Sequence, residues 1–232
     1  MNLFVVGDVH GCHYTFKNLV TRHWNPDTDF LIQLGDFINK GPHSAKVLRY
    51  ALKLISKYPY LVYFLRGNHE QMFLDSLRSG TFNLINRDTY QQIKIHPKLE
   101  LNKVKNWLKN LPIKWENRDI LITHAGVSRS ATDPFNPFSE SNVLINREPL
   151  RQLSNLQITG HVVQPLGKPT YIPRENAWHI DTGAYLGLGL SAVRVTYTGQ
   201  LLEVITQETD PRDLTVQNIP GLTSATDSLK FF

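Results

Sequence analysis

Short apolar runs alternate with helical patterns along the first half of the chain. Between the first three runs, apolar residues recur every three or four positions, as they do at Phe16, Leu19 and Val20 and again from Val47 to Tyr58. That period predicts helices. The runs carry β-branched or aromatic residues, end at glycine or a polar residue and are expected to form buried strands; they are Phe4 to Val6, Phe30 to Leu34, Leu61 to Leu65, Ile120 to Ile122 and Leu156 to Ile158. The alternation predicts βαβ units, with helices packed on a sheet.

The second half of the chain mixes helical, irregular and strand patterns. A third helix is predicted from near His69 to Leu77, and a fourth from Leu101 to Leu111, before Pro112. Stretches 81–99 and 128–146 show no clear period and are expected to be irregular. Strands are predicted after His161, with a hairpin turn at Thr198-Gly199; they are His179 to Asp181, Leu190 to Thr196 and Leu201 to Ile205.

The length and composition indicate one globular domain. A chain of 232 residues with 41% apolar and 19% charged residues can bury a sizeable core. We find no internal repeat. Residues 207–232 are rich in Thr, Asp and Gln and contain two prolines. We therefore expect a catalytic domain over residues 1–206 and a loose C-terminal tail over 207–232.

Cysteine content and hydropathy bear on the compartment. Cys12 is the only cysteine, so an internal disulfide is excluded. No apolar run approaches the ~18 residues that a membrane span requires. The apolar run Leu3 to Val6 is too short for the core of a signal peptide. The sequence thus predicts a cytoplasmic protein that has no membrane partner.

The net charge of +5 raises the question of an anionic partner. The pI of about 9.3 would suit nucleic acid. However, the lysines from Lys94 to Lys114 are scattered and form no tight block. We therefore interpret them as a solvated basic face and expect no nucleic-acid partner. No pattern indicates an oligomeric state.

Side chains that can bind metal follow each of the five buried strands predicted between Phe4 and Ile158. In α/β folds such groups gather beyond the carboxyl ends of the strands, where the loops leave a crevice. Most of these side chains stand beside a glycine, which lets the backbone approach a ligand closely. Each is ordinary by itself, but the six together are hard to obtain by accident; they are Asp8, His10, Asp36, Asn68, His124 and His161.

The spacing of these residues predicts two metal ions. Asp8 and His10 are two positions apart, so in an extended segment they point the same way and can bind one cation. Asp36 has two oxygens and can bridge that cation to a second, which Asn68, His124 and His161 would complete. A mixed shell of oxygen and nitrogen suits Mn²⁺, Fe or Zn²⁺ better than Ca²⁺. We expect two divalent ions about 3.5–4 Å apart, with Mn²⁺ favoured and Fe, Zn²⁺ or Ni²⁺ as alternatives.

Four further motifs carry a resemblance to a known family. Together with Gly-Asp at 35–36 and Gly-His at 160–161, they resemble the calcineurin-like metallophosphoesterase superfamily, and within it the phage and bacterial serine/threonine protein phosphatases. The resemblance covers about residues 3–205 and implies an α/β fold, a four-layer α/β/β/α sandwich with mixed sheets. The motifs are Gly-Asp-Val-His-Gly-Cys at 7–12, Arg-Gly-Asn-His-Glu-Gln-Met at 66–72, Asn-Arg-Glu at 146–148 and Ile-Asp-Thr-Gly-Ala at 180–184.

The resemblance also implies roles for individual residues. Asp36 would bridge one metal, bound by Asp8 and His10, to the other, bound by Asn68, His124 and His161. A metal-bridging hydroxide would attack phosphorus in line. His69 would protonate the leaving alkoxide as general acid. Arg147 would bind the substrate phosphate through its guanidinium, with Lys40 and Asn68 also placed among the substrate-binding residues. Asp181 is expected to brace the site without touching metal.

The sequence departs from the family pattern three residues after the bridging aspartate. The family has Asp-Arg-Gly there, whereas this chain has Asn39-Lys40-Gly41. The family's aspartate supports the protonated form of the catalytic histidine. Asn39 can still accept a hydrogen bond from His69 but brings no charge. Lys40 offers a point charge where the family's arginine offers a fork. These changes predict weaker catalysis or a different substrate.

Three functions follow from this pattern. Bacterial diadenosine tetraphosphate hydrolases also lack that aspartate, and residues 41–49 and 124–126 resemble theirs. The short chain and the motifs at 66–72 and 146–148 favour the phage-type phosphatase. We therefore predict hydrolysis of phosphate monoesters on a phosphoprotein or a small phosphorylated substrate, with a symmetrical dinucleoside polyphosphate hydrolase as the alternative. A binding module without activity is disfavoured, because all six ligands and the acid are present.

Overall fold

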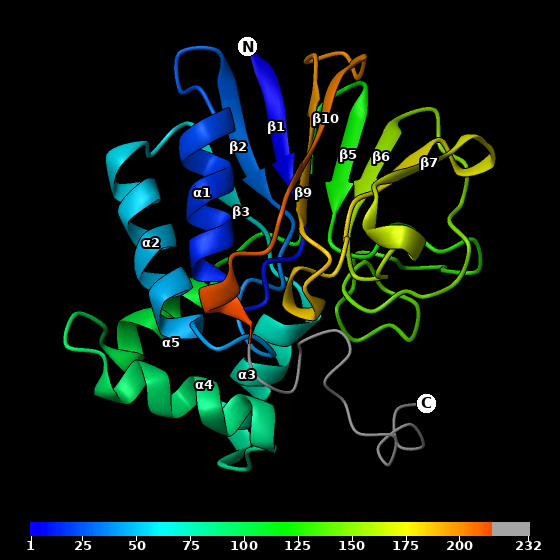
Figure 1. Ribbon diagram of the computed structural model, residues 1–232. Helices are drawn as coiled ribbons and strands as arrows, with labels where there is room; N and C mark the ends of the chain where they lie inside the picture. The colour runs from blue at the N-terminus through cyan, green and yellow to red at the C-terminus, as the bar shows by residue number, and fades with distance from the viewer. Residues whose placement is uncertain (215–232) are drawn as a thin grey trace, which may run out of the picture.

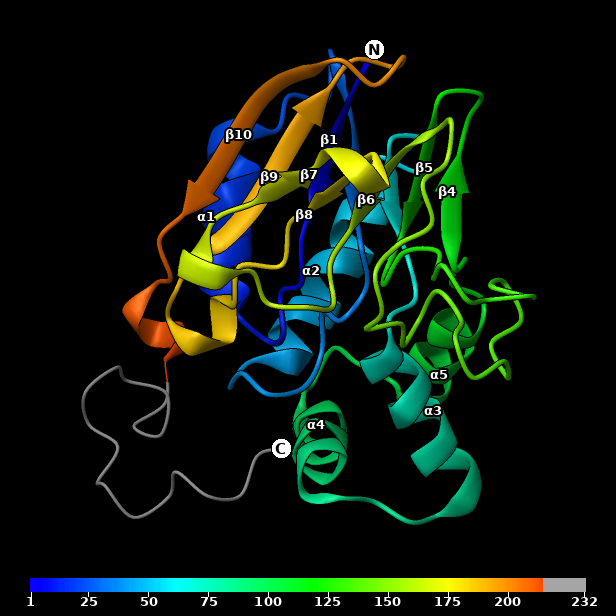
Figure 2. The ribbon, with the colours of Figure 1, turned by 90° about the vertical axis from the view of Figure 1, so that its right-hand side faces the viewer.

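The computed structural model of the chain describes residues 1–214. Within them two five-stranded sheets pack face to face (Figures 1 and 2). The first sheet, in the order β10-β9-β1-β2-β3, comprises β1 (Asn2–Val6), β2 (Asp29–Gln33), β3 (Val62–Phe64), β9 (Leu190–Val195) and β10 (Leu201–Gln207). The second sheet, in the order β4-β5-β6-β8-β7, comprises β4 (Lys114–Glu116), β5 (Ile120–Thr123), β6 (Leu156–Thr159), β7 (Thr170–Ile172) and β8 (Ala177–His179).

Both sheets are mixed. In the first, β1, β2 and β3 run parallel, whereas β9 and β10 are antiparallel to their neighbours. In the second, β5, β6 and β8 are parallel, and β4 and β7 form antiparallel edges. The helices are α1 (His13–His23), α2 (Ser44–Lys57), α3 (Asn68–Ser79), α4 (Leu84–Ile95) and α5 (Leu101–Lys109), with 3₁₀ turns η1 (Pro165–Gly167), η2 (Pro173–Glu175), η3 (Ala184–Leu186) and η4 (Pro211–Asp213). The predicted α/β fold with two mixed sheets and flanking helices is confirmed.

Alternating side chains of the central strands divide the core into layers. Phe4 and Val6 of β1 belong to the cluster under the helices, which includes Phe16 of α1 and Leu48 of α2. The alternate residues Leu3 and Val5 belong instead to the cluster between the two sheets. Successive residues of a strand point to opposite faces, so one apolar strand serves two layers. A continuous apolar run such as Phe4 to Val6 therefore indicates a strand buried on both faces.

The outer face of the second sheet is covered by chain without regular structure. Leu121 of β5 packs there with Val127 and Val143, and Phe135 and Leu153 are partly buried against them. These partners lie in or beside the stretch 128–146, whose irregular structure was predicted and is confirmed. The small cluster is thus the third layer of the core.

The expectation that residues 81–99 are irregular is wrong. They contain α4, which is capped by Asn83, whose side chain accepts a hydrogen bond from Asn86 N at 2.8 Å. Its buried positions include Asn86 and Thr89 as well as Ile93. Polar residues on the inner face hide the apolar period by which a helix is recognised. The short edge strands β4 and β7 were not predicted either, and β8 begins before the predicted His179 and ends there.

The first residues of the predicted tail pack against α1. Asp213 is fully buried, and its carboxylate accepts hydrogen bonds from Tyr14 N (3.2 Å), Thr15 N (2.7 Å) and Thr15 Oγ1 (2.7 Å). It therefore caps the N-terminus of a helix that has no acidic residue in its own first turn. The segment as far as residue 214 is thus fixed, contrary to a loose tail from 207. The remainder of the predicted tail lies outside the described residues.

Helix length sets one limit on the environment. No helix within residues 1–214 has the length and apolar composition that a membrane crossing needs.

Candidate metal centre

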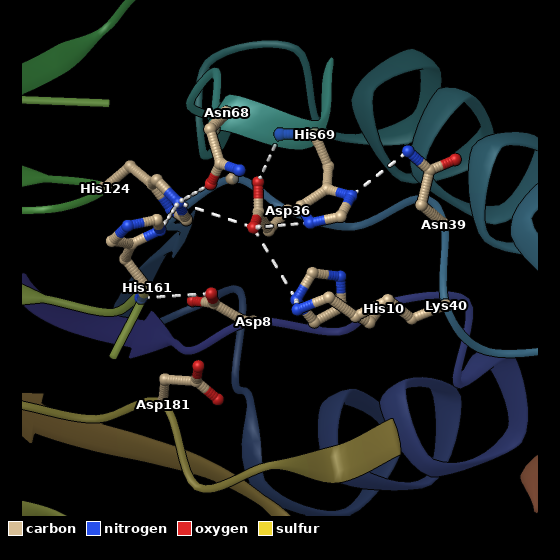
Figure 3. Close-up of polar contacts among 12 residues, drawn as sticks. Asp8, His10, Asp36, Asn39, Lys40, Asn68, His69, His124, His161 and Asp181 are labelled. Atoms are coloured by element: carbon tan, nitrogen blue, oxygen red, sulfur yellow. Dashed lines mark hydrogen bonds and ion pairs between the residues drawn. The ribbon is translucent and has the colours of Figure 1, made fainter. Parts of the chain in front are cut away.

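The six predicted ligands lie close together at one end of the two sheets. Each follows the carboxyl end of a strand, and Figure 3 shows their side chains converging on Asp36. Asn68 is half-buried, and the other five are buried. The structure thus brings together residues that are as far as 153 positions apart in the sequence.

Three ligand atoms gather around Nε2 of His124. Its Nε2 lies 2.9 Å from Asn68 Oδ1, 3.2 Å from His161 Nδ1 and 3.4 Å from Asp36 Oδ2. A single N–H can serve only one of these neighbours, so the remaining lone pairs face one another. A bound cation would satisfy all of them. This is the group predicted for the second metal.

The group around His10 differs in one member from the prediction. His10 Nε2 lies 3.5 Å and His69 Nε2 3.9 Å from Asp36 Oδ2. The ligand atoms of His10, Asp36 and His69 lie within 4.8 Å of one another, as do those of Asp36, His124 and His161. Asp36 belongs to both groups, as a bridging ligand must. His69, predicted as the acid, therefore sits at ligand distance from this position.

Asp8 lies beside these groups, between His10 and His161 (Figure 3). Its Oδ2 accepts a hydrogen bond from His161 N at 3.0 Å. Its Oδ1 is buried and has no hydrogen-bond partner within residues 1–214. An unpaired buried carboxylate oxygen is costly unless a cation compensates it. The residues present therefore fit two divalent cations that share Asp36.

His10 is held with the correct nitrogen toward Asp36. Its Nδ1 lies 3.2 Å from the carbonyl oxygen of Ile38, which can only accept, so Nδ1 carries the hydrogen. Nε2 therefore offers a lone pair. In the structure this nitrogen accepts a hydrogen bond from Lys40 Nζ at 3.0 Å, and Lys40 also lies over the ring of Tyr185 at 4.4 Å. Tyr185 was not predicted as a site residue.

The backbone of the site is strained where the ligands attach. Five non-glycine residues of the site have φ angles in the left-handed region, which residues other than glycine seldom adopt. These angles are 43° at His10, 52° at Asp36, 70° at Asn39, 63° at Lys40 and 68° at His161. The neighbouring glycines leave room for carboxylates. A Cβ on Gly160 would lie 2.0 Å from Asp8 Oδ1, and one on Gly67 would lie 2.2 Å from Asp36 Oδ1. Glycine beside the ligands is therefore a steric requirement.

Glu70 holds the loop that carries Asp36. Its buried carboxylate accepts hydrogen bonds from the backbone N–H groups of Gly67 (2.8 Å), Asp36 (2.7 Å), Phe37 (3.0 Å) and Ile38 (3.3 Å). It thereby ties the end of β2 to the start of α3. The sequence motif at 66–72 contains Glu70 but does not by itself indicate this supporting role. Its place three residues after Gly67, where a glutamate can cap a helix, was the available signal.

Burial and mutual charge set the pKa values in the site. Burial and the neighbouring Asp181 hold the pKa of Asp8 well above its usual range. Burial acts to raise the pKa of Asp36 too, but His124 and the other imidazoles hold it well below its usual range. Burial would lower the pKa of His124, yet Asp36 and Asp8 raise it to about 9. Burial lowers the pKa of His161 to about 3. Closely packed buried carboxylates of this kind favour bound cations.

A chain of amides from α4 orients His69. Asn86 Nδ2 donates to the backbone oxygen of Met72 (3.2 Å), which can only accept, so Asn86 Oδ1 faces Asn39. Asn39 Nδ2 donates to Asn86 Oδ1 (2.8 Å) and lies 3.1 Å from His69 Nδ1. Thr89 Oγ1 donates to Asn39 Oδ1 at 2.6 Å. Asn39 therefore donates to His69, whereas we expected it to accept.

This direction fixes the tautomer of His69. Because Nδ1 accepts from Asn39, the hydrogen of the imidazole is on Nε2, the nitrogen that faces Asp36. Burial also lowers the pKa of His69 to about 4. The expectation about Asn39 was wrong because Thr89 occupies its oxygen, and Thr89 belongs to the helix that the sequence did not predict.

The remaining predicted residues lie around the centre. Arg147 is exposed, but its positive charge helps to lower the pKa values of His69 and His161. Its loop is fixed by Asn146, whose Nδ2 donates to Ala125 O at 3.3 Å, next to His124. Asp181 is buried beside Asp8 (Figure 3) and accepts a hydrogen bond from Gly183 N at 2.9 Å.

Comparison with known proteins places this geometry in a wider context. The sequence profile of the family described as calcineurin-like phosphoesterase matches residues 1–193. The symmetrical bis(5'-nucleosyl)-tetraphosphatase of Acidovorax ebreus (strain TPSY) is 37% identical over 132 residues, which is 55% of this chain and 44% of that protein. The chain thus spans about half the length of the first relatives it matches. Serine/threonine-protein phosphatase 2 of Salmonella typhimurium is 27% identical over 212 residues, 84% of this chain and 93% of that protein.

Two solved structures resemble the fold. A putative diadenosine tetraphosphatase superimposes with a TM-score of 0.64 at 19% identity, covering 90% of this chain and 95% of the other. A protein serine/threonine phosphatase from Saccharomyces cerevisiae gives a TM-score of 0.63 at 16% identity, covering 90% and 80%. At such identities the likeness concerns the fold alone.

Proposed function

The chain belongs to the calcineurin-like phosphoesterases and is a metal-dependent phosphoesterase hydrolase, and on this premise we propose that it cleaves phosphoanhydrides, with a dinucleoside polyphosphate as the substrate. The observation that supports this choice is the hydrogen bond from Asn39 to His69. It bears on how a leaving group is protonated. Leaving groups are where the two candidate substrates differ.

His69 holds a proton at Nε2 as a neutral imidazole. A neutral imidazole is a far weaker acid than an imidazolium, and Asn39 offers no negative charge that would favour the imidazolium. The alkoxide that leaves phosphoserine is strongly basic and depends on a proton donor. The phosphate that leaves an anhydride is a stable anion, since its second pKa is about 6. An anhydride substrate therefore suits this histidine better.

The other residues of the site bind and orient the substrate. Two divalent ions in the centre would polarise the phosphoryl group and generate the nucleophile. Arg147, on the loop fixed by Asn146, would bind phosphate oxygens through its fork. Lys40, held over Tyr185 at the rim, would add a positive charge beside the phosphate chain. The names of the relatives agree, because several are called symmetrical bis(5'-nucleosyl)-tetraphosphatases.

A phosphoprotein phosphatase is the second candidate. The similarity to the protein phosphatase of Salmonella typhimurium extends over 93% of that protein, whereas the similarity to the tetraphosphatases covers less than half of theirs. The sequence motifs at 66–72 and 146–148 favour this function. The hydrogen bond from Asn39 to His69 favours the anhydride over the phosphoprotein, because a neutral His69 is too weak an acid to protonate a leaving alkoxide.

Turnover of two substrates under the same metal tests the proposal. Diadenosine tetraphosphate should be cleaved with a kcat/KM at least about tenfold above that of a phosphothreonine peptide, a difference of about 1.4 kcal/mol in barrier. The Asn39→Asp variant should raise turnover of the peptide and of alkyl phosphates more than that of aryl phosphates, whose leaving groups need less protonation. Preference of the unaltered enzyme for the peptide would reject the anhydride. A lack of all hydrolysis with Mn²⁺, Mg²⁺, Co²⁺ and Ni²⁺ would contradict the enzyme itself.

We also propose Mn²⁺ as the native metal, supported by the mixed oxygen and imidazole donors. Metal analysis of protein purified without added metal tests this. We expect close to two Mn²⁺ per chain, and two Fe, Zn²⁺ or Ni²⁺ instead would overturn the assignment.

A further inference from the structure

A basic pocket lies on the helical side of the molecule, apart from the metal centre. It has a volume of about 420 Å³ and lies between α1, α2 and the segment that joins α4 to α5. Five cationic side chains line it, and within residues 1–214 no carboxylate does; the cations are Lys17, Lys46, Arg49, Lys53 and Lys98. None of them is a predicted ligand of the metals. Cations from three separate segments of the chain thus converge on one pocket.

The basic residues of α2 run along one face of the helix. Lys46, Arg49, Lys53 and Lys57 follow one another at intervals of three and four residues, so their side chains are neighbours. No ion pair within residues 1–214 includes any of them. Like charges at this spacing destabilise a helix. Lys46 also lies in the first turn, where the helix dipole disfavours a cation.

Helix stability therefore does not explain this face. The sequences of α1 and α2 contain no aspartate or glutamate at all. A helix selected only for stability would alternate the signs of its charges. Repulsion between fixed cations is relieved when an anion binds among them, so the arrangement favours a bound polyanion.

His13 also lines the pocket, and its pKa responds first to burial and then to the positive charges around it. Burial and the nearby Lys46, His43 and Lys17 lower its pKa to about 4. The imidazole is therefore neutral at physiological pH. Its Nδ1 is buried and has no hydrogen-bond partner in the described part of the chain. A phosphate oxygen or hydroxyl of a ligand could satisfy this atom.

We propose that this pocket binds the oligophosphate chain of a small ligand, at a site separate from the metal centre. The volume is within the usual range for small-molecule sites, and the side chains of Tyr50 and Pro97 add an apolar wall beside the cations. Cations placed around a hollow suit a compact polyanion. A nucleic-acid strand would instead need cations along an extended track.

Calorimetric titration of the metal-loaded enzyme in Mg²⁺ buffer tests the site. The probes are inorganic diimidotriphosphate and adenosine 5'-(β,γ-imido)triphosphate, whose imido linkages resist hydrolysis. The double variant Arg49→Ala/Lys53→Ala should weaken binding of these probes at least about tenfold, because two charge-assisted contacts are lost. The control Lys103→Ala/Lys109→Ala removes the same charge from exposed positions on α5 and should change binding less than about twofold.

Further outcomes separate the sources and the alternatives. Equal affinity for both probes would assign binding to the phosphates alone, and tighter binding of the nucleotide would add contacts to its base; both support the site. Unchanged binding in Arg49→Ala/Lys53→Ala, or equal loss in the control, would overturn it. So would tighter binding of a 20-nucleotide single strand than of either probe. If the double variant does not fold by circular dichroism, Lys53→Ala alone, at an exposed position, should still weaken binding.

Discussion

The two sheets bring different chemistry to one centre. The first supplies both carboxylates, Asp8 and Asp36, together with His10 and Asn68, whereas the second supplies only the imidazoles His124 and His161. They also hold these residues differently. Loops of the first sheet are tied by backbone pairs, such as His10 N to Asp36 O at 2.8 Å, and in addition by a side chain, since Glu70 accepts four backbone N–H groups. Loops of the second are tied by backbone pairs, such as Gly160 N to His124 O at 2.8 Å.

This difference shows why the centre forms only where the sheets meet. Buried carboxylates repel one another, and against the effect of burial His124 of the second sheet, together with His10 and His69, holds the pKa of Asp36 down. The cluster between the sheets, which includes Ile32, Leu34 and Ile158, sets the distance between the two sets of ligands. Packing of the sheets and binding of the metals are therefore coupled. Variants that alter the residues of one sheet at a time test this coupling.

Loss of the bridging residue should have the largest effect. Asp36→Asn removes the only side chain that belongs to both ligand groups within residues 1–214. We expect kcat to fall at least about a thousandfold, of the order seen when a principal electrostatic group is removed, and metal content to drop below two per chain. Asp181→Asn is the matched control and should retain both metals. Two metals bound in Asp36→Asn would contradict a bridge.

A methyl group at Gly160 should break the contact of the second sheet with the first. Its Cβ would meet Asp8 Oδ1 at 2.0 Å, and displacement of a site residue by about 1 Å can cost about a hundredfold in rate. Steady-state kinetics should show this loss. Gly80→Ala is the control, because nothing lies within 4 Å of its Cβ, although its φ of +75° strains the helix end. Normal activity of Gly160→Ala would mean that Asp8 does not act from this position.

Glu70→Gln tests the side-chain tie of the first sheet. The glutamine amide would turn a donor toward backbone donors, leaving buried N–H groups unpaired. We expect a loss of about 3 kcal/mol in the free energy of unfolding, measured by denaturant titration. Glu100→Gln, whose exposed carboxylate pairs with Lys103, should lose less than about 1 kcal/mol. Equal losses of stability in the two variants would show that the hydrogen bonds of Glu70 contribute no more than an exposed ion pair.

Thr89→Val should have the smallest effect. The valine has the shape of threonine but cannot donate to Asn39 Oδ1, so the amide that orients His69 gains freedom. We expect a change of about 1 kcal/mol, or roughly fivefold in kcat, typical of one hydrogen bond. The ratio of rates on alkyl and aryl phosphates is the measurement. An unaltered ratio would remove Thr89 from the account of His69.

The sequence predicted the residues that converge in the centre better than the residues that support them. Ligands follow apolar strands and stand beside glycine, and both signals are local. Glu70, Asn86 and Thr89 act through contacts with residues tens of positions away, which no local pattern reveals. Polar residues on the inner face of α4 also hid that helix, and with it the direction of the bond to His69. The basic pocket escaped for a similar reason, since its cations come from three separate segments.

The cap that Asp213 places on α1 has a consequence for biosynthesis. Tyr14 and Asp213 are 199 positions apart, so the first helix emerges from the ribosome long before its cap. At about 5–20 residues per second the delay is roughly 10–40 s. During that interval the N–H groups at the start of α1 are without this acceptor, and a chaperone could bind the exposed segment. The cap on α1 therefore cannot form until Asp213, near the end of the described residues, has been synthesised.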